Sequence, residues 1–316
     1  INITITLGAM TMYLLLFRQG QSAVSAGLGS IGGMYEDNLY LTNLYEYLEQ
    51  APQQHQGSAV DGPAPKDGVR FENVSFKYPG ETTATLVDIN MNVRPGESLA
   101  LVGENGAGKS TIIKLLCGFY TPASGRVLLH GRDIQEWDRD ILHRRIGVIF
   151  QDFNRYQFNV GENIGAGDVE GFSDEARWKD SAQKGMATPF IERMEYGFKT
   201  QLGNWFKYGK ELSTGQWQKV ALSRAFMRSG AEVLVLDEPT AAMDAGAEAE
   251  LFEYFRDHTK GKITVLISHR FSTVRQADRI AVLEQGHIIE CGTHDELMAK
   301  PDVYAKLFRL QAEGYR

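Results

Sequence analysis

Short aliphatic runs recur along the second half and middle of the chain, and stretches with helical spacing separate them. The runs are centred near Leu99, Val148, Val233, Val265 and Ile280. Continuous apolar runs of strand length are typical of parallel strands whose two faces are both covered by helices. The pattern therefore predicts an α/β core built on a mainly parallel sheet.

The regions around this core have other patterns. Residues 69–93 alternate between apolar and polar, as in VRFENVSF, which predicts an antiparallel β subdomain. Residues 151–227, or thereabouts, contain few runs of strand length, so we assign them to a helical subdomain. Residues 282–290 (VLEQGHIIE) are expected to form a closing hairpin, and residues 293–311 are expected to form C-terminal helices.

The N-terminal segment is apolar first and amphipathic afterwards. Residues 1–17 contain no charged residue. As a helix they would extend roughly 25 Å, slightly less than a hydrocarbon core of about 30 Å. After Arg18 the pattern becomes amphipathic, with Leu41, Leu44 and Leu48 at helical spacing. A helix that leaves a bilayer and continues into the cytoplasm fits both halves, and a buried helix of a soluble domain is the alternative.

A linker is predicted between this helix and the core. Residues 51–68 are rich in Pro, Gln, Gly and Ala and show no periodicity. The chain is thus divided into a helix (1–50), a linker (51–68) and a globular domain (69–316). Its 316 residues are enough for one full-sized domain and an appendage.

The net charge and the cysteine content limit which partners and which cellular compartment are expected. The net charge is −7, which argues against a nucleic-acid surface because such surfaces use Lys and Arg to contact phosphates. We therefore expect membrane and protein partners. Cys117 and Cys291 are too few for a disulfide framework and have no metal-ligand spacing, as suits a reducing cytosol.

The segment GENGAGKS, which begins at Gly103, matches the pattern G-x-x-x-x-G-K-[ST]. Its glycines let backbone N–H groups converge on the β- and γ-phosphates of a nucleotide, and Lys109 adds a positive charge there. Ser110 begins the following helix and offers its hydroxyl to Mg²⁺. The predicted nucleotide contacts of this segment are Gly103, Asn105, Gly106, Gly108, Lys109, Ser110 and Thr111.

Two further strands end in side chains suited to phosphate chemistry. The strand at residues 233–236 ends in Asp237 and Glu238. Because open parallel sheets bind ligands at the C-terminal ends of their strands, Asp237 is expected to hold Mg²⁺. Glu238 is expected to accept a proton from the attacking water or to orient it. The strand at residues 265–267 similarly ends just before His269, whose place at the tip of the strand makes it a candidate catalytic residue.

The segment LSTGQ (residues 212–216) resembles the signature of ATP-binding-cassette (ABC) proteins, usually LSGGQ. The resemblance implies that Tyr78 stacks on adenine and that Gln151 senses Mg²⁺ and the γ-phosphate. ATP and Mg²⁺ are therefore the expected cofactors. It also implies that Asp244 lies at a dimer interface and that His269 is the switch histidine. The implied fold is the P-loop ABC cassette, and the implied catalytic residues are Lys109, Gln151, Glu238 and His269.

Cassettes of this family work as head-to-tail dimers, which implies that Ser213, Gly215 and Gln216 of one copy close over the nucleotide of the other. Because the signature opens a predicted helix, its N–H groups can face an anion. A homodimer is expected, and a heterodimer with a second cassette remains open. Thr214 departs from the usual glycine and adds a β-branched side chain close to where phosphate would approach.

The N-terminal helix resembles the last transmembrane helix of exporters whose membrane and ATPase domains are fused. We therefore expect the C-terminal part of a longer exporter in an inner or plasma membrane, with its ATPase domain on the cytoplasmic side. A soluble ABC ATPase acting on nucleic acid or ribosomes is the alternative and would share every catalytic residue. The apolar N-terminus and the acidic balance favour the exporter.

Overall fold

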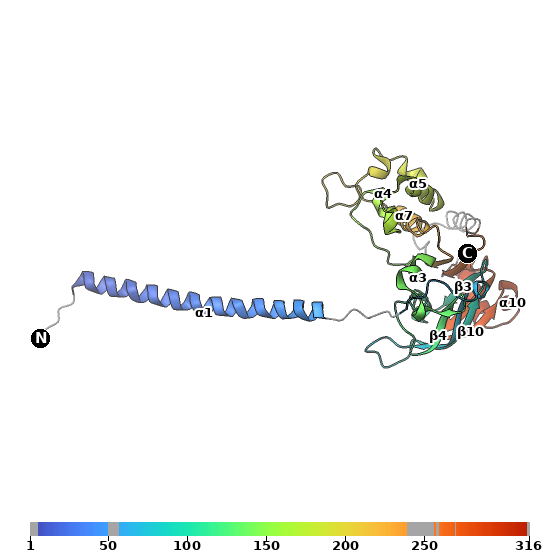
Figure 1. The fold of residues 1–316 in the computed structure, drawn as a ribbon, viewed down its shortest axis with the longest axis horizontal. Helices are drawn as coiled ribbons and strands as arrows, with labels where there is room; N and C mark the ends of the chain where they lie inside the picture. The colour runs from blue at the N-terminus through green and yellow to red at the C-terminus, as the bar shows by residue number, and fades with distance from the viewer. Residues whose placement is uncertain (1–5, 50–56, 239–255, 257–258, 269, 315–316) are drawn as a thin grey trace. The chain divides into compact units, whose positions relative to one another are not determined.

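The computed structural model describes residues 6–49, 57–238, 256, 259–268 and 270–314. The chain separates into two compact units, Ile1–Gln54 and His55–Arg316. The first contains one long helix, α1 (Leu7–Glu49), and the second contains every other described helix and strand (Figure 1).

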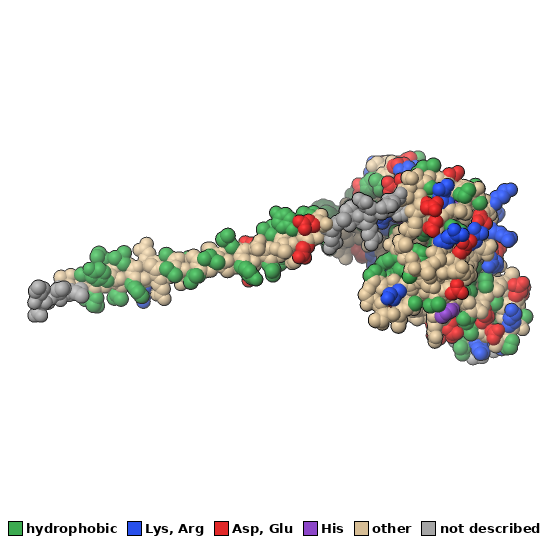
Figure 2. Space-filling view, turned by 60° about the horizontal axis from the view of Figure 1, so that its bottom comes forward, with side chains coloured by type: hydrophobic (Ala, Val, Ile, Leu, Met, Phe, Trp, Pro, Cys, Tyr) green, Lys and Arg blue, Asp and Glu red, His purple; other side chains and the backbone are tan. Residues whose placement is uncertain are grey.

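Helix α1 has no buried residue within its own unit. Large apolar side chains are exposed along much of its length, as Figure 2 shows. Among the residues that the structure describes, no helix is both long and apolar enough to cross a membrane, because the apolar run gives way to polar residues from Arg18 onward. The predicted membrane-spanning segment is therefore not found within residues 6–49.

The second unit contains two sheets. The smaller is antiparallel, as predicted for residues 69–93, and a later strand pairs with β1 to extend it. Its strands, in spatial order, are β2 (Leu86–Val93), β1 (Val69–Phe76), β4 (Ser124–Leu129) and β5 (Arg132–Asp133).

The larger sheet has six strands and is parallel except for the pair β9–β10. All five aliphatic runs of the sequence form its strands, and the predicted closing hairpin is the pair β9–β10. The spatial order is β10 (His287–Gly292), β9 (Arg279–Glu284), β3 (Ser98–Gly103), β8 (Ile263–Ile267), β7 (Val233–Asp237) and β6 (Ile146–Ile149). The predicted α/β fold class is thus confirmed.

The part of the chain between β6 and β7 forms a separate group of helices (Figure 1). That group is the helical subdomain, and it consists of α4 (Val160–Gly165), α5 (Glu175–Lys184), α6 (Thr188–Ile191) and α7 (Thr214–Phe226). The remaining α-helices of the described residues are α2 (Lys109–Leu116), α3 (Arg139–Arg145), α9 (Phe271–Val274), α10 (His294–Met298) and α11 (Val303–Gly314). Short 3₁₀ helices lie at Pro65–Asp67, Ile134–Glu136, Val169–Gly171 and Gly197–Lys199.

Helix α7 belongs to two hydrophobic clusters. Leu222 and Ala225 pack with Leu234 of β7, on the face of the six-stranded sheet. Trp217 and Val220 pack instead within the helical subdomain. Burial of both faces explains why this helix is apolar on more than one side, and it joins the helical subdomain to the sheet.

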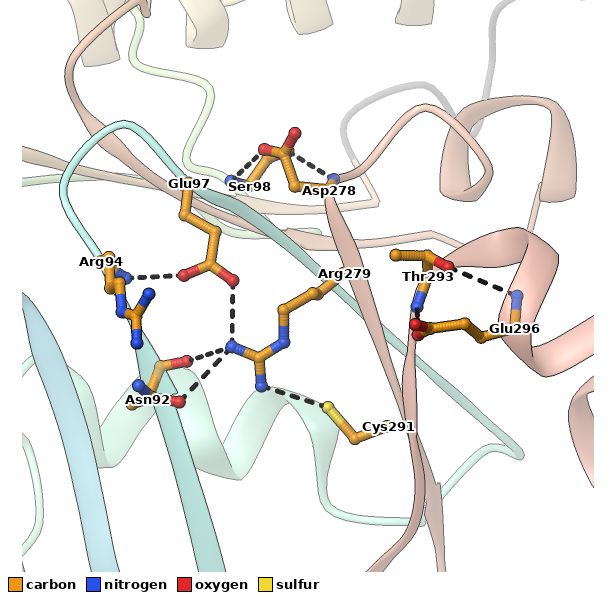
Figure 3. A network of polar contacts seen from close by, with 9 residues as sticks. All are labelled: Asn92, Arg94, Glu97, Ser98, Asp278, Arg279, Cys291, Thr293 and Glu296. Carbon is orange, nitrogen blue, oxygen red and sulfur yellow. Dashed lines mark hydrogen bonds and ion pairs between the residues drawn. The ribbon is translucent and has the colours of Figure 1, made fainter.

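A polar network closes the end of the sheet where β3 and β9 begin (Figure 3). Arg279 of β9 donates to Glu97 at 2.9 Å, to the Asn92 carbonyl at 3.1 Å and to the sulfur of Cys291 at 3.3 Å. Its guanidinium thus ties β2 and β10 to the start of β3. The strands are fixed at this end, and the opposite end of β3 leads into the glycine-rich loop.

Candidate active site

The glycine-rich loop follows β3 directly and leads into α2. A Cβ at Gly103 would lie 2.2 Å from the carbonyl oxygen of Leu283, so any residue with a side chain would clash there. Gly108 has a φ of +102°, a conformation that residues with a side chain rarely adopt. Asn105 and Gly106 are exposed on the loop. The backbone therefore turns tightly here because glycine occupies these two positions.

Lys109 is the buried cation of this loop, with only 6% of its surface exposed. Its Nζ donates to the Gly103 carbonyl at 2.7 Å and to the Glu104 carbonyl at 2.8 Å. Burial lowers the pKa of Lys109, and the charges of Glu238 and Asp237 oppose that effect. The ammonium group is thus held by the loop in a partly desolvated setting, where its attraction to phosphate is stronger than in water.

Asp237 ends β7 and is 4% exposed. Burial raises the pKa of Asp237, a hydrogen bond from Ser110 lowers it, and the nearby Glu238 raises it again. The strand end and the loop are therefore in contact. A carboxylate and a hydroxyl oxygen fit Mg²⁺, which binds through one or two protein oxygens together with substrate phosphates.

Glu238 lies one residue beyond this strand in an unusual backbone conformation. Its φ is +49°, and its N–H donates to the Ile267 carbonyl at 3.0 Å, at the end of β8. Nε2 of Gln151 donates to Oε2 of Glu238 at 2.9 Å. A left-handed conformation costs a non-glycine residue about 1–3 kcal/mol, and such strain tends to occur at functional sites.

Tyr78 lies beside α2. Its hydroxyl is 3.1 Å from Oγ1 of Thr111, and Nζ of Lys114 is 5.5 Å from its ring centroid. The rings of Phe76 and Tyr120 contact it edge-on, at centroid distances of 4.9 and 5.2 Å. An aromatic ring is thereby held next to the helix that begins with Lys109.

The signature residues begin α7 and belong to the helical subdomain. The Ser213 hydroxyl accepts from the Gln216 backbone at 3.3 Å, and the Gln216 side chain accepts from the Ser213 backbone at 3.0 Å. This reciprocal pair is a capping box. Ser213 and Thr214 are exposed, and Gly215 is partly exposed. Among the hydrogen bonds of the described residues, none joins this turn to the glycine-rich loop.

Two predicted site residues, Asp244 and His269, lie outside the described residues. Two others were missed by sequence reasoning. Asp152 acts on Asp237 electrostatically and raises its pKa, and Lys114 lies over Tyr78. Each had a signal in the chain, since Asp152 directly follows Gln151 and Lys114 lies one helical turn after Lys109 and Ser110.

The structure thus brings together Lys109, Ser110, Gln151, Asp237 and Glu238 at the C-terminal end of the parallel strands. A strand, a glycine-rich loop and a helix, with a carboxylate from a nearby strand, define a P-loop nucleotide-binding protein. The signature turn at the start of α7 adds a feature that ordinary P-loop kinases lack.

Comparison with known proteins agrees with this class. A family model described as "ABC transporter" matches residues 86–241. The subtilin transport ATP-binding protein SpaT of Bacillus subtilis is 39% identical over 303 residues, which cover 96% of this chain and 49% of SpaT. The ATP-dependent lipid A-core flippase of Chromohalobacter salexigens is 41% identical over 269 residues, covering 85% and 45% of the two chains.

A solved structure is also similar, that of a bacterial Atm1-family ABC exporter with ATP bound. It is 30% identical, with a TM-score of 0.78, and the match covers 88% of this chain and 48% of the exporter chain. The chain belongs to the ABC transporter family and contains the family's ATP-binding ATPase domain. It spans about half the length of the curated relatives that it matches.

Proposed function

We propose that this chain is the ATPase part of a fused ABC exporter and couples ATP-driven association of two cassettes to solute export. One observation carries the proposal. The match to SpaT covers 303 of 316 residues, so it includes most of α1 as well as the cassette. Similarity to a transport protein that extends over α1 favours an exporter over a soluble ABC ATPase acting on nucleic acid or ribosomes.

The site residues suggest how hydrolysis proceeds. Lys109 and the N-terminus of α2 bind the β- and γ-phosphates. Ser110, Asp237 and Gln151 would hold Mg²⁺, which would supply positive charge to neutralise the phosphate oxygens. Glu238 accepts a proton from the attacking water. Gln151 holds the Glu238 carboxylate through the 2.9 Å hydrogen bond and so keeps it at the end of β7.

The second cassette completes the site. Ser213, Gly215 and Gln216 are capped among themselves and at least partly exposed at the end of α7, so they can face a nucleotide held by another copy. Asp244 and His269 are assigned to the same interface and to the γ-phosphate. Either a second copy of this chain or a different cassette can supply the opposing surface.

Helix α1 and the linker after it are assigned to the membrane side of the cassette. We assign residues 1–50 to the helix that connects the exporter's membrane domain to the cassette, residues 51–68 to a linker and residues 69–316 to the cassette. The exposed apolar side chains of α1 support this assignment, since they would contact membrane-domain helices. The cassette then lies on the cytoplasmic side of an inner or plasma membrane.

The test is ATP hydrolysis by the complete polypeptide in lipid vesicles. We expect hydrolysis that requires Mg²⁺, stops with Glu238→Gln and is accompanied by ATP-dependent solute movement. Hydrolysis stimulated by RNA, DNA or ribosomes and indifferent to lipid would contradict the exporter assignment.

A further inference from the structure

Arg224 is a half-buried arginine near the C-terminal end of α7, three helical turns after the signature. Ser213 and Arg224 are separated by roughly 16 Å at the helical rise of about 1.5 Å per residue. Nε of Arg224 donates to the Asn163 carbonyl at 2.9 Å, and Nη1 donates to the Asn154 carbonyl at 3.0 Å. A third bond of 3.3 Å joins Nη2 to the Asn163 side chain.

The partners of Arg224 belong to the segment that follows Gln151. Its guanidinium lies 4.7 Å from the ring centroid of Tyr156. Asn163 is fully buried, and its Nδ2 donates to the carbonyls of Tyr156, Phe158 and Asn159 at 3.1, 3.2 and 3.1 Å. Arg224 and Asn163 thus fix the path of residues 154–163 against α7, which lies beside α4 (Figure 1).

Burying a guanidinium is costly unless its N–H groups are bonded, and these contacts meet that need with backbone and amide oxygens. These contacts also lead from α7 towards the catalytic carboxylate. Asn154 is three residues after Gln151, and Gln151 bonds to Glu238. The position of the signature helix is therefore connected to the carboxylate that accepts the proton.

We propose that Arg224 is a positioning residue that transmits the placement of the signature helix α7, through Asn154, to the contact between Gln151 and Glu238. When a second cassette engages Ser213 at one end of α7, the other end pulls or releases the segment that carries Gln151. This role rests on the proposed function, because it acts on ATP hydrolysis.

Arg228, close to the same end of α7, offers a matched control. It lies just after α7, and its guanidinium also donates to carbonyls, those of Gly167 at 2.9 Å, Ile146 at 3.1 Å and His143. None of these belongs to residues 151–159. Arg228→Lys therefore imposes a similar loss of forked hydrogen bonds without touching the segment after Gln151.

The test is a double-mutant cycle measured on ATP hydrolysis by the complete polypeptide. Arg224→Lys keeps the charge but cannot bond Asn154 and Asn163 together. We expect it to lower kcat about tenfold with less than about a threefold change in KM. In a Gln151→Ala background the same change should lower kcat by less than about twofold, because the connection is already cut. Arg228→Lys should have equal effects in both backgrounds.

Equal losses of kcat from Arg224→Lys in the native and the Gln151→Ala backgrounds would show that Arg224 only supports the fold. An unchanged kcat when Arg224→Lys is made in the native protein would also overturn the proposed role. If Arg224→Lys does not fold, Tyr156→Leu is compared in the same way, since it removes the ring beneath the guanidinium and spares its hydrogen bonds. Equal losses there overturn the role. Absence of ATP hydrolysis in the unaltered protein would overturn the proposed function and this role together.

Discussion

Gln151 and Glu238, 87 residues apart in the chain, are joined by a hydrogen bond of 2.9 Å. The bond connects the segment after β6 to the residue after β7. Glu238 is also fixed by its backbone bond to Ile267. The carboxylate therefore has a defined position next to Asp237, and this position underlies the first prediction.

Glu238→Gln should preserve ATP binding and slow hydrolysis by about 10²–10⁴-fold, the usual contribution of a general base. The glutamine has nearly the same size but cannot accept the proton. The measurement is ATP turnover beside equilibrium ATP binding, and the protein should accumulate as an ATP-bound dimer. Glu170→Gln, at an exposed surface glutamate, is the control. Near-normal turnover in Glu238→Gln would exclude this residue as the base.

Tyr78→Ala should raise the KM for ATP with a smaller change in kcat, because stacking on the base binds the ground state and the transition state equally. Tyr78→Phe keeps the ring and removes the hydroxyl that contacts Thr111. It should therefore behave almost like the native protein. A collapse of kcat at constant KM in Tyr78→Ala would mean that the ring does not bind adenine.

Thr214→Gly should strengthen ATP-driven dimerisation, since removal of the side chain at this exposed position lets the opposing phosphate approach the backbone more closely. The measurement is the dimer fraction against ATP concentration. Thr214→Ser, which removes only the methyl group, should give an intermediate value. A weaker dimer with glycine would show that the threonine contributes to the interface.

Asp237→Asn should stabilise the nucleotide-free protein and abolish Mg²⁺-dependent hydrolysis. Burial raises the pKa of Asp237, so the ionised form costs stability once the pH exceeds the ordinary aspartate pKa of about 3.9 and rises through the higher folded value. The neutral amide removes that cost. The gain in Tm at pH 7 should shrink as the pH is lowered towards 4. A lower Tm in the variant at pH 7 would show that the favourable contacts of the ionised Asp237, such as its hydrogen bond from Ser110, outweigh the cost of its burial.

Mixing two inactive variants should restore one site if the site is shared between chains. Lys109→Ala removes the phosphate clamp, and Ser213→Arg blocks the signature that faces the other chain. In a mixed dimer the intact Lys109 of one chain meets the intact Ser213 of the other. The measurement is occlusion of ATP, with each variant alone as the control. If mixed dimers form and occlude no ATP, the signature does not complete the partner's site.

The sequence by itself determined the parts of the protein whose chemistry is local. The glycine-rich loop, with Lys109 and Ser110, is one contiguous segment whose conformation follows from its own glycines. The five aliphatic runs identified the strands of the large sheet because each is buried on both faces. The apolar start of the chain, by contrast, predicted a membrane-spanning segment that is not found among residues 6–49.

The tertiary structure decided what depends on distant parts of the chain. The bond from Gln151 to Glu238, the left-handed backbone at Glu238 and the electrostatic effect of Asp152 on Asp237 all require β6, β7 and the glycine-rich loop to be packed first. The same holds for Arg224, which in the sequence is one more basic residue on a helix. Two of its partners are backbone carbonyl oxygens, which every residue has, so only the packing of α7 against residues 154–163 selects which of them it binds.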